Sequence, residues 1–419
     1  MRGRTARIKV RVGLPKTGGA LVAAARRAGY PVLFSANAFA KAYPLGHERQ
    51  GEFRGFSMPD LQQLAGMDAA LDSAGFVAAA KYGDYRWRVE DYMRLAAAFP
   101  WAWYASMDYC CEPQVSDDRL LRMLRIAATC QLYARCSAEA DRLGIQQPMP
   151  VIQGWHAHEY ATCIDWMPLA GRSWPDIVGV GSVCRRSLDG EHGIRRILQV
   201  LDEKLPAHVR LHLFGVKSKA LEALGPHPRI ASMDSMAWDF GARQKRRTGR
   251  DMAFRIECMR EWAERQHEVA RRIEAVRALQ DGESAPQDPQ MDLFSLEDPP
   301  RPARLFELQT VERLAGFMPS DVLGSAMECL AQGYCDLILE GQIDYHGAVS
   351  MANWDVVVVA SVYAQAGQAM DDEAAEHIES MIGLDFAERW RARVASGEGD
   401  APEMVEGTRL LREGVRAAA

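Results

Sequence analysis

The chain of 419 residues lacks any long uninterrupted apolar stretch. A membrane-spanning helix needs roughly 18 or more such residues, so the sequence excludes a membrane-spanning protein of that kind. The N-terminal segment MRGRTARIKVRVG is basic but lacks the apolar core of a secretory signal peptide. These two absences predict a cytoplasmic protein that makes no contact with a membrane.

The cysteines are too irregular for a disulfide framework. Nine are present, an odd number at uneven spacings, and this pattern is typical of reduced thiols in a cytoplasm. The adjacent residues Cys110 and Cys111 are poorly placed for normal disulfide geometry, so we interpret them as packing residues.

Lysine is absent from the last third of the chain, where acidic residues dominate. Residues 281–419 contain nine Arg, no Lys and 26 Asp or Glu, a net charge of −17. Because the whole chain carries −6, residues 1–280 carry +11. A basic body with an acidic C-terminal part is common in proteins that handle a polyanion. Two solvated surfaces of opposite sign explain the same distribution, so charge alone leaves both interpretations open.

No glycine-rich phosphate-binding turn opens the first predicted helix, which disfavours a dinucleotide-binding fold. Instead, apolar segments alternate with helical patterns every roughly 30 to 40 residues, which is typical of a parallel sheet with helical crossovers. Seven strands are predicted up to Asp234, and the position of an eighth is ambiguous. The count favours an α/β fold of the (β/α)8 barrel type. The predicted strands lie within residues 31–36, 67–76, 101–108, 149–155, 176–182, 208–215 and 230–234.

Composition divides the chain into three parts. Residues 1–280 form the predicted barrel. Residues 281–302 are rich in Pro, Asp, Glu and Gln, a composition typical of a flexible linker. Residues 303–419 resume a helical pattern, and we expect an acidic, mostly helical region. The sequence does not assign it a role: docking of a partner protein and covering of a nucleic-acid channel are both open.

Five of the predicted strands end in a polar residue. The strands of a parallel barrel present their carboxyl ends on one face, where catalytic groups gather. One aspartate alone is equally well explained as the N-cap of the next helix. Five such residues on different strands weaken that explanation and predict a site on this face. They are Asp72, Asp108, Gln153, Ser182 and Asp234.

Six ordered motifs surround these residues. They are Leu71-Asp-Ser-Ala-Gly-Phe76, Ser106-Met-Asp-Tyr-Cys-Cys-Glu-Pro113, Val151-Ile-Gln-Gly154, Val178-Gly-Val-Gly-Ser-Val-Cys-Arg-Arg186, Leu211-His-Leu-Phe-Gly-Val-Lys217 and Met233-Asp-Ser-Met-Ala-Trp238. The set resembles the tRNA-guanine transglycosylase superfamily. The forms Gly-Ser-Val-Cys-Arg-Arg and Asp-Ser-Met-Ala-Trp resemble its DNA-modifying branch, the 7-deazaguanine DNA transglycosylases. One difference is Ala74, which stands where the family block has glycine.

The resemblance implies a transferase that exchanges guanine in DNA for a 7-deazaguanine base, such as 7-cyano-7-deazaguanine, without cutting the backbone. Breaking the N-glycosidic bond develops positive charge at C1′, which a carboxylate can trap covalently; Asp234 is the expected nucleophile. Asp72 is the expected general acid and base. Gln153 and the backbone N–H groups around Gly181-Ser182 are expected to face O6 and the 7-substituent. Recognition of the base is assigned to Asp108, Gln153, Gly181 and Ser182.

The substrate nucleotide must be flipped out of a duplex or already single-stranded to reach such a pocket. Tyr109, Trp155 and Trp238 are candidates to stack on the base, although such residues are more often simple core. Basic residues near the motifs are the expected contacts of DNA phosphates, although a solvated helix face would give the same pattern. They are Arg185, Arg186, Arg243, Lys245, Arg246 and Arg247.

The zinc site of the tRNA enzymes is not matched. Those enzymes bind zinc with three cysteines and a histidine beyond the nucleophile, and the corresponding region here has only Cys258 and His267, without a CxxC pair. A tetrahedral site of that kind needs three thiolates. We therefore expect neither a structural zinc nor another cofactor.

Three alternative functions remain. A tRNA substrate is disfavoured by the lack of an appended basic module after residue 300. A non-catalytic nucleic-acid-binding subunit that keeps the barrel is disfavoured by the presence of both Asp72 and Asp234. A metal-dependent barrel hydrolase is suggested by the His156-Ala-His158 pair, but such sites need further ligands on later strands.

Overall fold

The computed structural model describes residues 8–184, 186–216, 218–245, 251–279, 303–315 and 320–365. The chain forms two compact units. The first combines Met1–Val115 with Thr129–Pro300, and the second combines Ser116–Ala128 with Arg301–Ala419. Residues 116–128 therefore group with the C-terminal part of the chain, an arrangement that the sequence pattern does not reveal.

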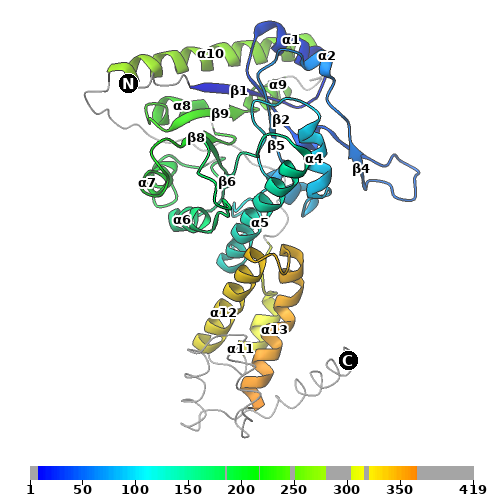
Figure 1. The fold of residues 1–419 in the computed structure, drawn as a ribbon, viewed down its shortest axis with the longest axis vertical. Helices are drawn as coiled ribbons and strands as arrows, with labels where there is room; N and C mark the ends of the chain where they lie inside the picture. Colours follow the sequence, from blue (N-terminus) through cyan, green and yellow to red (C-terminus); the bar gives the residue numbers. More distant parts are fainter. Residues whose placement is uncertain are drawn as a thin grey trace. The chain divides into compact units, whose positions relative to one another are not determined.

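The first unit is built on a curled, seven-stranded sheet (Figure 1). All its strand pairs are parallel, and the order is β5-β2-β1-β9-β8-β7-β6. This arrangement confirms the prediction of an α/β fold with a parallel sheet. The strands are β1 (Lys9–Leu14), β2 (Val32–Ser35), β5 (Ala69–Asp72), β6 (Val151–Ile152), β7 (Ile177–Val180), β8 (Arg210–Leu213) and β9 (Ile230–Ser235).

Strand β1 was not predicted, because its residues look like a basic terminus. In Lys9-Val-Arg-Val-Gly-Leu14 a charge alternates with an apolar residue, yet only Lys9 is exposed. Arg11 is buried and pairs with Asp68 at 2.9 Å, while its guanidinium also donates to the carbonyl of Val32 at 3.2 Å. Strand β1 lies between β2 and β9. One of the two neighbours of β9 in the sheet is therefore the first strand of the chain.

The predicted strand at 101–108 contributes only isolated bridges to the sheet. Leu71 of β5 bridges to Tyr104, and Ala105 bridges to Met149, both in parallel orientation. The Ala105 amide donates to the Leu71 carbonyl at 2.9 Å, and the Ser106 amide donates to the Met149 carbonyl at 2.8 Å. Residues 104–106 therefore form backbone hydrogen bonds both with the edge strand β5 and with the segment that leads into β6.

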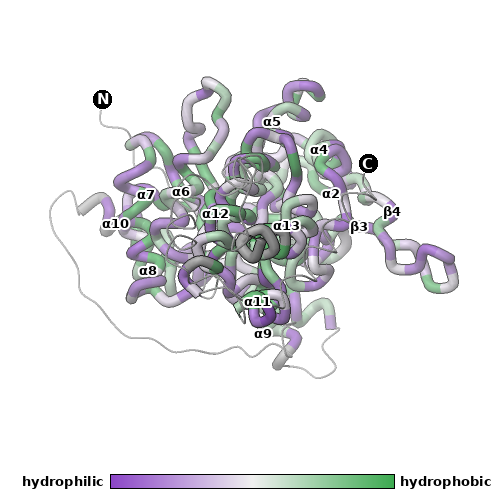
Figure 2. Tube along the Cα trace, turned by 90° about the horizontal axis from the view of Figure 1, so that it is seen from below, coloured by the Kyte–Doolittle hydropathy of each residue, from purple (hydrophilic) through white to green (hydrophobic). Residues whose placement is uncertain are grey.

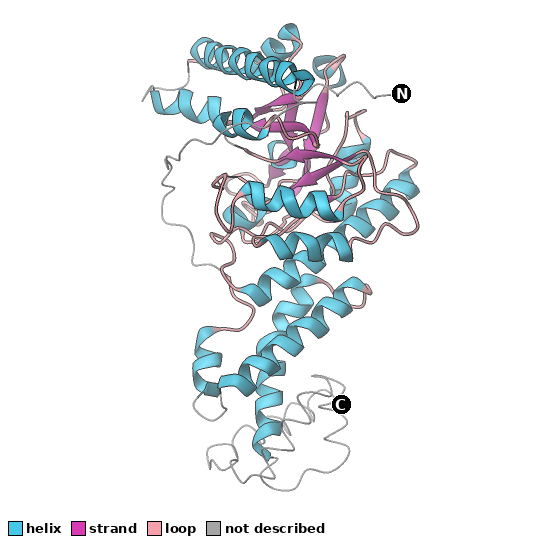
Figure 3. Ribbon diagram, turned by 90° about the vertical axis from the view of Figure 1, so that its left-hand side faces the viewer, coloured by secondary structure: helices cyan, strands magenta, loops and turns pink. Residues whose placement is uncertain are grey.

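Helices surround the sheet on its outer side (Figure 3). In α7, Ile194, Ile197 and Leu201 are buried while Arg195 is exposed, so one apolar face packs inward. Figure 2 shows this alternation of hydrophilic and hydrophobic positions along the outer helices. The longer helices are α1 (Ala20–Ala28), α4 (Val89–Ala97), α5 (Arg119–Leu143), α6 (Ala157–Trp166), α7 (Ile194–Lys204), α8 (Ser218–Leu224), α9 (Ala237–Lys245) and α10 (Met252–Leu279).

Short elements complete the first unit. Strands β3 (Ala40–Ala42) and β4 (Phe53–Phe56) form an antiparallel hairpin. The short helical segments are η1 (Ala36–Ala38), α2 (Leu61–Leu64), α3 (Gly75–Val77) and η2 (Ala78–Tyr82). Among the described residues, no helix is both long and apolar enough to cross a membrane.

The described part of the second unit is helical. It contains α11 (Leu308–Ala315), α12 (Ser320–Leu339), α13 (Tyr345–Gln365) and the first residues of α5. Arg119 of α5 pairs with Glu328 of α12 at 2.7 Å, and Arg125 donates to the Tyr345 hydroxyl at 3.2 Å. The helical pattern predicted after residue 303 therefore corresponds to helices up to Gln365, whereas residues 366–419 and the predicted linker at 281–302 lie outside the described residues.

Candidate active site

Three of the predicted site residues form one hydrogen-bonded chain at the carboxyl ends of the strands. Gln153 Nε2 donates to Asp108 Oδ2 at 2.5 Å, and Gln153 Oε1 accepts from Ser182 Oγ at 2.7 Å. All three residues are at least nine-tenths buried. Each follows a different apolar segment, so parallel strands bring together side chains that lie far apart in sequence. We call Asp108, Gln153 and Ser182 the hydrogen-bonded chain.

Asp108 is held from three sides. Its Oδ1 accepts from the Ser73 hydroxyl at 2.7 Å. The Tyr85 hydroxyl donates to the Asp108 carbonyl at 2.9 Å and accepts from the Asp108 amide at 3.2 Å. A Cβ added at Gly75 would lie 2.6 Å from the Asp108 carbonyl oxygen, so this close approach requires glycine. The carboxylate is therefore oriented before any ligand arrives.

The backbone around Ser182 leaves room for Gln153. A Cβ added at Gly181 would lie 2.2 Å from Gln153 Nε2, so glycine is required there for packing. The Gly181 amide donates to the Ile152 carbonyl at 3.0 Å. This N–H is therefore bonded within the sheet and does not face the base, while the expectation for the Ser182 amide stays a prediction. Ser182 has φ 52°, and its hydroxyl also lies 2.9 Å from Oε2 of the buried Glu112.

Asp72 lies at the end of β5, and its surroundings favour the protonated carboxyl. Its Oδ2 accepts from the Ala74 amide at 3.1 Å. Burial, together with the negative charges of Asp108 and Asp234, raises the pKa of Asp72 to about 8. Ala74 has φ 72°, a conformation that favours glycine, and it is the position where the sequence differs from the family block. At neutral pH the Asp72 carboxyl is mostly protonated.

Asp234 lies within β9, one residue before its end. Its Oδ1 accepts from the Gly215 amide at 2.9 Å, and His212 Nε2 lies 3.4 Å from the same oxygen. His212 is fully buried, and burial lowers its pKa, so the imidazole is neutral at pH 7. Its Nδ1 is paired with the Ser232 hydroxyl at 2.8 Å. A neutral ring that accepts at Nδ1 presents Nε2–H toward Asp234.

Beneath these carboxylates the sheet encloses a cation and aromatic rings. Arg11 is the parallel-register partner of Asp234 and stacks over Trp103 at 5.3 Å. Trp103 in turn contacts His212, with ring centroids 4.6 Å apart. The buried positive charge of Arg11 is attracted by both Asp68 and Asp234. Arg11, Trp103 and His212 are all buried, so the sheet is closely packed next to Asp234.

Arg186 has a different role from the predicted phosphate contact. Its guanidinium is buried and stacks on Trp155 at 3.8 Å. Its five donors are all occupied, since Nε donates to the Ser182 carbonyl at 2.9 Å and the terminal nitrogens donate to four further acceptors. A guanidinium without a spare donor cannot bind phosphate. The prediction for Arg186 is therefore wrong, and the residue ties the loops after β6 and β7 together.

The other predicted phosphate contacts lie near the end of α9 or outside the described residues. Arg243 is exposed and pairs with the buried Asp239 at 3.1 Å. Lys245 is the last residue of α9, and its side chain is not described. Arg185, Arg246 and Arg247 lie outside the described residues.

The three aromatic candidates differ in their surroundings. Trp238 is buried, and its Nε1 donates to the Gly13 carbonyl at 3.1 Å, which fixes it as a packing residue. Tyr109 is buried and contacts Tyr85, with ring centroids 5.9 Å apart. Trp155 is partly exposed and has one face covered by Arg186, so its other face is the surface of the three best suited to stack on a base.

The zinc site of the tRNA enzymes does not fit the residues present. Cys258 and His267 both lie on α10. Nine residues of helix separate them by roughly 13 Å, at a rise of about 1.5 Å per residue. One ion cannot contact both, since zinc–ligand bonds are about 2.0–2.3 Å long. No step of the chemistry can be assigned to such an ion.

Residues 49–285 match the family model described as DpdA, DeoxyPurine in DNA protein A. The chain belongs to the DpdA family. The match covers more than half of the chain and contains all five strand-end residues, and it confirms the resemblance to the DNA-modifying branch of the superfamily. A comparison with curated proteins found no match.

Sequence reasoning missed several buried polar residues of this DpdA-family site. Glu112 and His212 both lie within motifs of the sequence, where neither has an assigned role. Tyr85, which holds Asp108, carries no motif of its own. A signal existed for His212 alone: a histidine is an unusual choice at a buried strand position. It directly precedes the Leu-Phe-Gly turn whose amide binds Asp234.

Proposed function

We propose that this DpdA-family protein is a DNA-guanine transglycosylase that exchanges guanine for a 7-deazaguanine base, such as 7-cyano-7-deazaguanine. The observation that carries the proposal is the hydrogen-bonded chain beside two carboxylates. The raised pKa of Asp72 keeps this carboxyl protonated near neutral pH, while Asp234 accepts a hydrogen bond from the Gly215 amide. Base exchange needs both properties in one site, because it requires a recognition surface and a nucleophile paired with a proton carrier.

Recognition follows from the donors and acceptors of guanine. The N1–H and N2–H groups are donors, and a carboxylate such as that of Asp108, which Ser73 and Gln153 hold in place, is suited to accept from them. The second hydrogen of Gln153 Nε2 can donate to O6. An adenine lacks N1–H and O6, so it would form fewer hydrogen bonds with Asp108 and Gln153 than guanine does, and this favours guanine.

The chemistry divides into two steps that share one proton. In the first, an Asp234 oxygen forms a bond to C1′ as the bond from C1′ to N9 of guanine breaks, and Asp72 gives its proton to the leaving base. In the second, N9 of the incoming base forms a bond to C1′, the ester to Asp234 breaks, and the N9 proton passes to Asp72. Asp72 ends in its starting state, and its pKa of about 8 suits both directions.

We further infer that the sheet closes into a (β/α)8 barrel. The seven strands and the segment around Tyr104 and Ala105 make eight parallel pieces, and the bridges of that segment to Leu71 and Met149 support closure. A closed barrel brings the carboxyl ends of β5 and β6 close together, which accounts for the contact between Asp108 and Gln153.

The direct test compares three nucleic acids. Duplex DNA, single-stranded DNA and tRNA, each with labelled guanine, are incubated with the protein and 7-cyano-7-deazaguanine, and the released guanine is counted. We expect release from DNA that depends on the added base. Release from tRNA alone would refute DNA as the substrate, and binding without release from any of the three would favour a non-catalytic subunit.

A further inference from the structure

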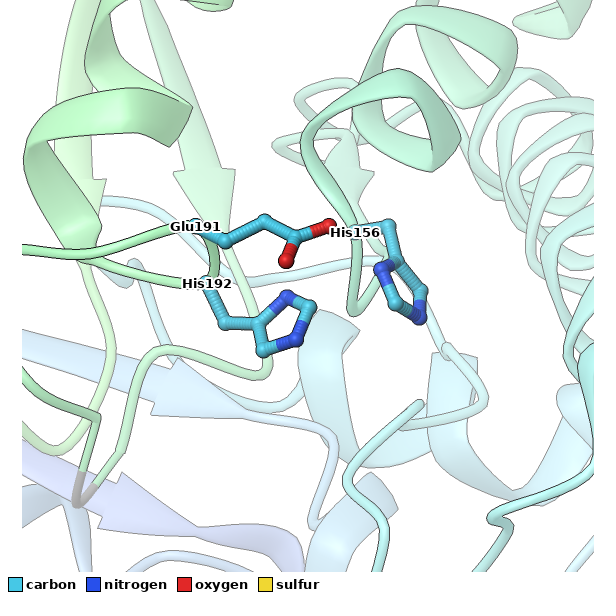
Figure 4. Close-up of side chains that lie close together, drawn as sticks. All are labelled: His156, Glu191 and His192. Carbon is cyan, nitrogen blue, oxygen red and sulfur yellow. The ribbon is translucent and has the colours of Figure 1, made fainter.

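Three metal-binding side chains meet beside the candidate active site, outside its chemistry. His156 directly precedes α6, and Glu191 and His192 lie in the loop between β7 and α7. Their ligand atoms all lie within 4.8 Å of one another. Figure 4 shows the Glu191 carboxylate directed between the two imidazole rings, whose centroids are 4.6 Å apart at an angle of 85°.

We propose that His156, Glu191 and His192 form a binding site for a divalent transition metal ion of the zinc class. Two imidazole nitrogens and one carboxylate oxygen are a donor set that zinc uses, and three protein ligands leave a fourth position for water. Ligands about 2.1 Å from a tetrahedral ion lie roughly 3.4 Å from one another. Small side-chain rotations close the present separations to that value, because Glu191 is exposed and free to adjust.

The backbone that carries both histidines is already held in place. A single terminal nitrogen of Arg186 donates to the Trp155 carbonyl at 2.7 Å and to the His192 carbonyl at 2.8 Å. Oε2 of the buried Glu159 accepts from the amides of Trp155 and His156, at 2.7 and 3.0 Å. Groups of this kind orient metal ligands and raise metal affinity. Arg186 therefore joins the segment that carries His156 to the loop that carries His192.

One ring nitrogen of these three residues is buried without a hydrogen-bond partner among the described residues. His192 Nδ1 is enclosed by protein and has no hydrogen-bond partner among the described residues. A buried polar atom without a partner is unfavourable, and a metal ion bound at this nitrogen would satisfy it. His158, by contrast, stacks on His156 at 5.5 Å and 23° but is exposed and does not belong to the group of three.

The site is distinct from the zinc site of the tRNA enzymes, which lies beyond the nucleophile and does not fit this chain. It connects the segment that follows Gln153 with the loop that follows Ser182. A bound ion would fix this loop against the start of α6 and so stiffen one wall of the candidate base pocket. Metal binding does not depend on the proposed base exchange, so an experiment can refute either proposal without refuting the other.

The test uses the full-length protein, freed of any affinity tag, stripped with a chelator and titrated with Zn²⁺ or with Co²⁺. We expect one equivalent after desalting and the visible absorption of a tetrahedral Co²⁺ site. His156→Ala and His192→Ala should each lower affinity by more than the about 10- to 100-fold that loss of a supporting group causes. Glu191→Gln, an exposed change that preserves shape, should weaken binding at least about 10-fold.

Two matched controls decide where any bound metal lies. His158→Ala and Cys258→Ser should bind one equivalent as the unmodified protein does. The proposal is overturned if the unmodified protein takes up no stoichiometric metal, if Glu191→Gln and both histidine variants bind as tightly, or if Cys258→Ser alone abolishes binding. Melting curves of the metal-free variants show whether each is folded, and Glu191→Gln remains informative if a histidine variant is not.

Discussion

The hydrogen-bonded chain and the two carboxylates Asp72 and Asp234 lie on the same edge of the sheet, but their polar groups are satisfied differently. Asp108 accepts from two side chains, and Gln153 is clamped between Asp108 and Ser182. Asp72 and Asp234, in contrast, each accept from one backbone amide, at 3.1 and 2.9 Å, and Asp234 also faces Nε2 of the neutral His212 at 3.4 Å. Recognition of a base needs fixed donors and acceptors, whereas nucleophilic attack and proton transfer need groups that can change charge. In the proposed function, the residues of the hydrogen-bonded chain bind the base, and Asp72 and Asp234 carry out the chemistry.

The largest effect should follow removal of the nucleophile. Asp234→Ala should lower guanine release by at least about 1,000-fold, as loss of a nucleophile does in other covalent enzymes, while DNA binding in a gel-shift assay stays unchanged. Asp165→Asn is the matched control, because Asp165 is an exposed carboxylate that pairs with the surface Lys204 at 2.8 Å. Full activity of the alanine variant would move the nucleophile elsewhere.

Removal of the proton carrier should have a smaller effect with a distinct pH dependence. Asp72→Asn should lower base release by about 100- to 10,000-fold, the range typical of general acid–base catalysis. In the unmodified protein, release should fall as the pH rises through about 8, because Asp72 then loses the proton that the leaving base needs. The Asn variant should lack this decline in its residual rate.

Asp72 also makes a testable contribution to stability. Its pKa rises from 3.8 to about 8 on folding, so between these values the folded state binds more protons than the unfolded state. The free energy of unfolding should therefore fall as the pH rises through this window. Asp72→Asn should melt progressively higher than the unmodified protein between pH 5.5 and 8.5. Parallel melting curves for the two proteins would contradict the raised pKa.

Within the hydrogen-bonded chain, Gly181→Ala should affect binding before chemistry. The added Cβ would lie 2.2 Å from Gln153 Nε2, so Gln153 must move and its contacts with Asp108 and Ser182 weaken. We expect KM to rise by roughly 10-fold or more, from loss of about 1–3 kcal/mol of hydrogen bonding. Gly241→Ala, where nothing lies within 4 Å of the added atom, should leave KM unchanged.

The smallest effect is expected at Tyr85, which holds the backbone of Asp108 without facing the base. Tyr85→Phe removes two hydrogen bonds to that backbone, at 2.9 and 3.2 Å. The two bonds together contribute about 1–3 kcal/mol, but they hold the backbone and only part of that loss reaches the base, so KM should rise a few-fold with kcat little changed. A larger fall in kcat than in binding would show that Tyr85 acts in the chemistry.

The sequence was sufficient to predict that strand-end residues converge. Asp108, Gln153 and Ser182 follow apolar segments, and parallel strands necessarily bring such positions to one edge of the sheet. The family could be predicted from the sequence for the same reason, because its motifs contain these strand-end residues. Fold class and the grouping of these residues thus follow from periodicity and the positions of polar side chains.

Other features could not be predicted because they depend on burial of charge. Arg11 makes β1 look like a basic tail, and only the partner Asp68, far away in sequence, neutralises it. Arg186 stands in a basic pair that predicts a phosphate contact, yet backbone carbonyls of the loops after β6 and β7 occupy its donors. A sequence does not reveal which charges are paired by distant backbone groups.

The measurement that tests the central claim most directly is capture of the covalent intermediate. The protein is mixed with guanine-containing DNA labelled in the backbone and denatured before any 7-deazaguanine is added, and the adduct is mapped by mass spectrometry of its peptides. We predict labelled DNA attached to the peptide that contains Asp234, lost when free 7-deazaguanine base is supplied and absent in Asp234→Ala. Attachment at another residue, or base exchange by Asp234→Ala, would contradict the account.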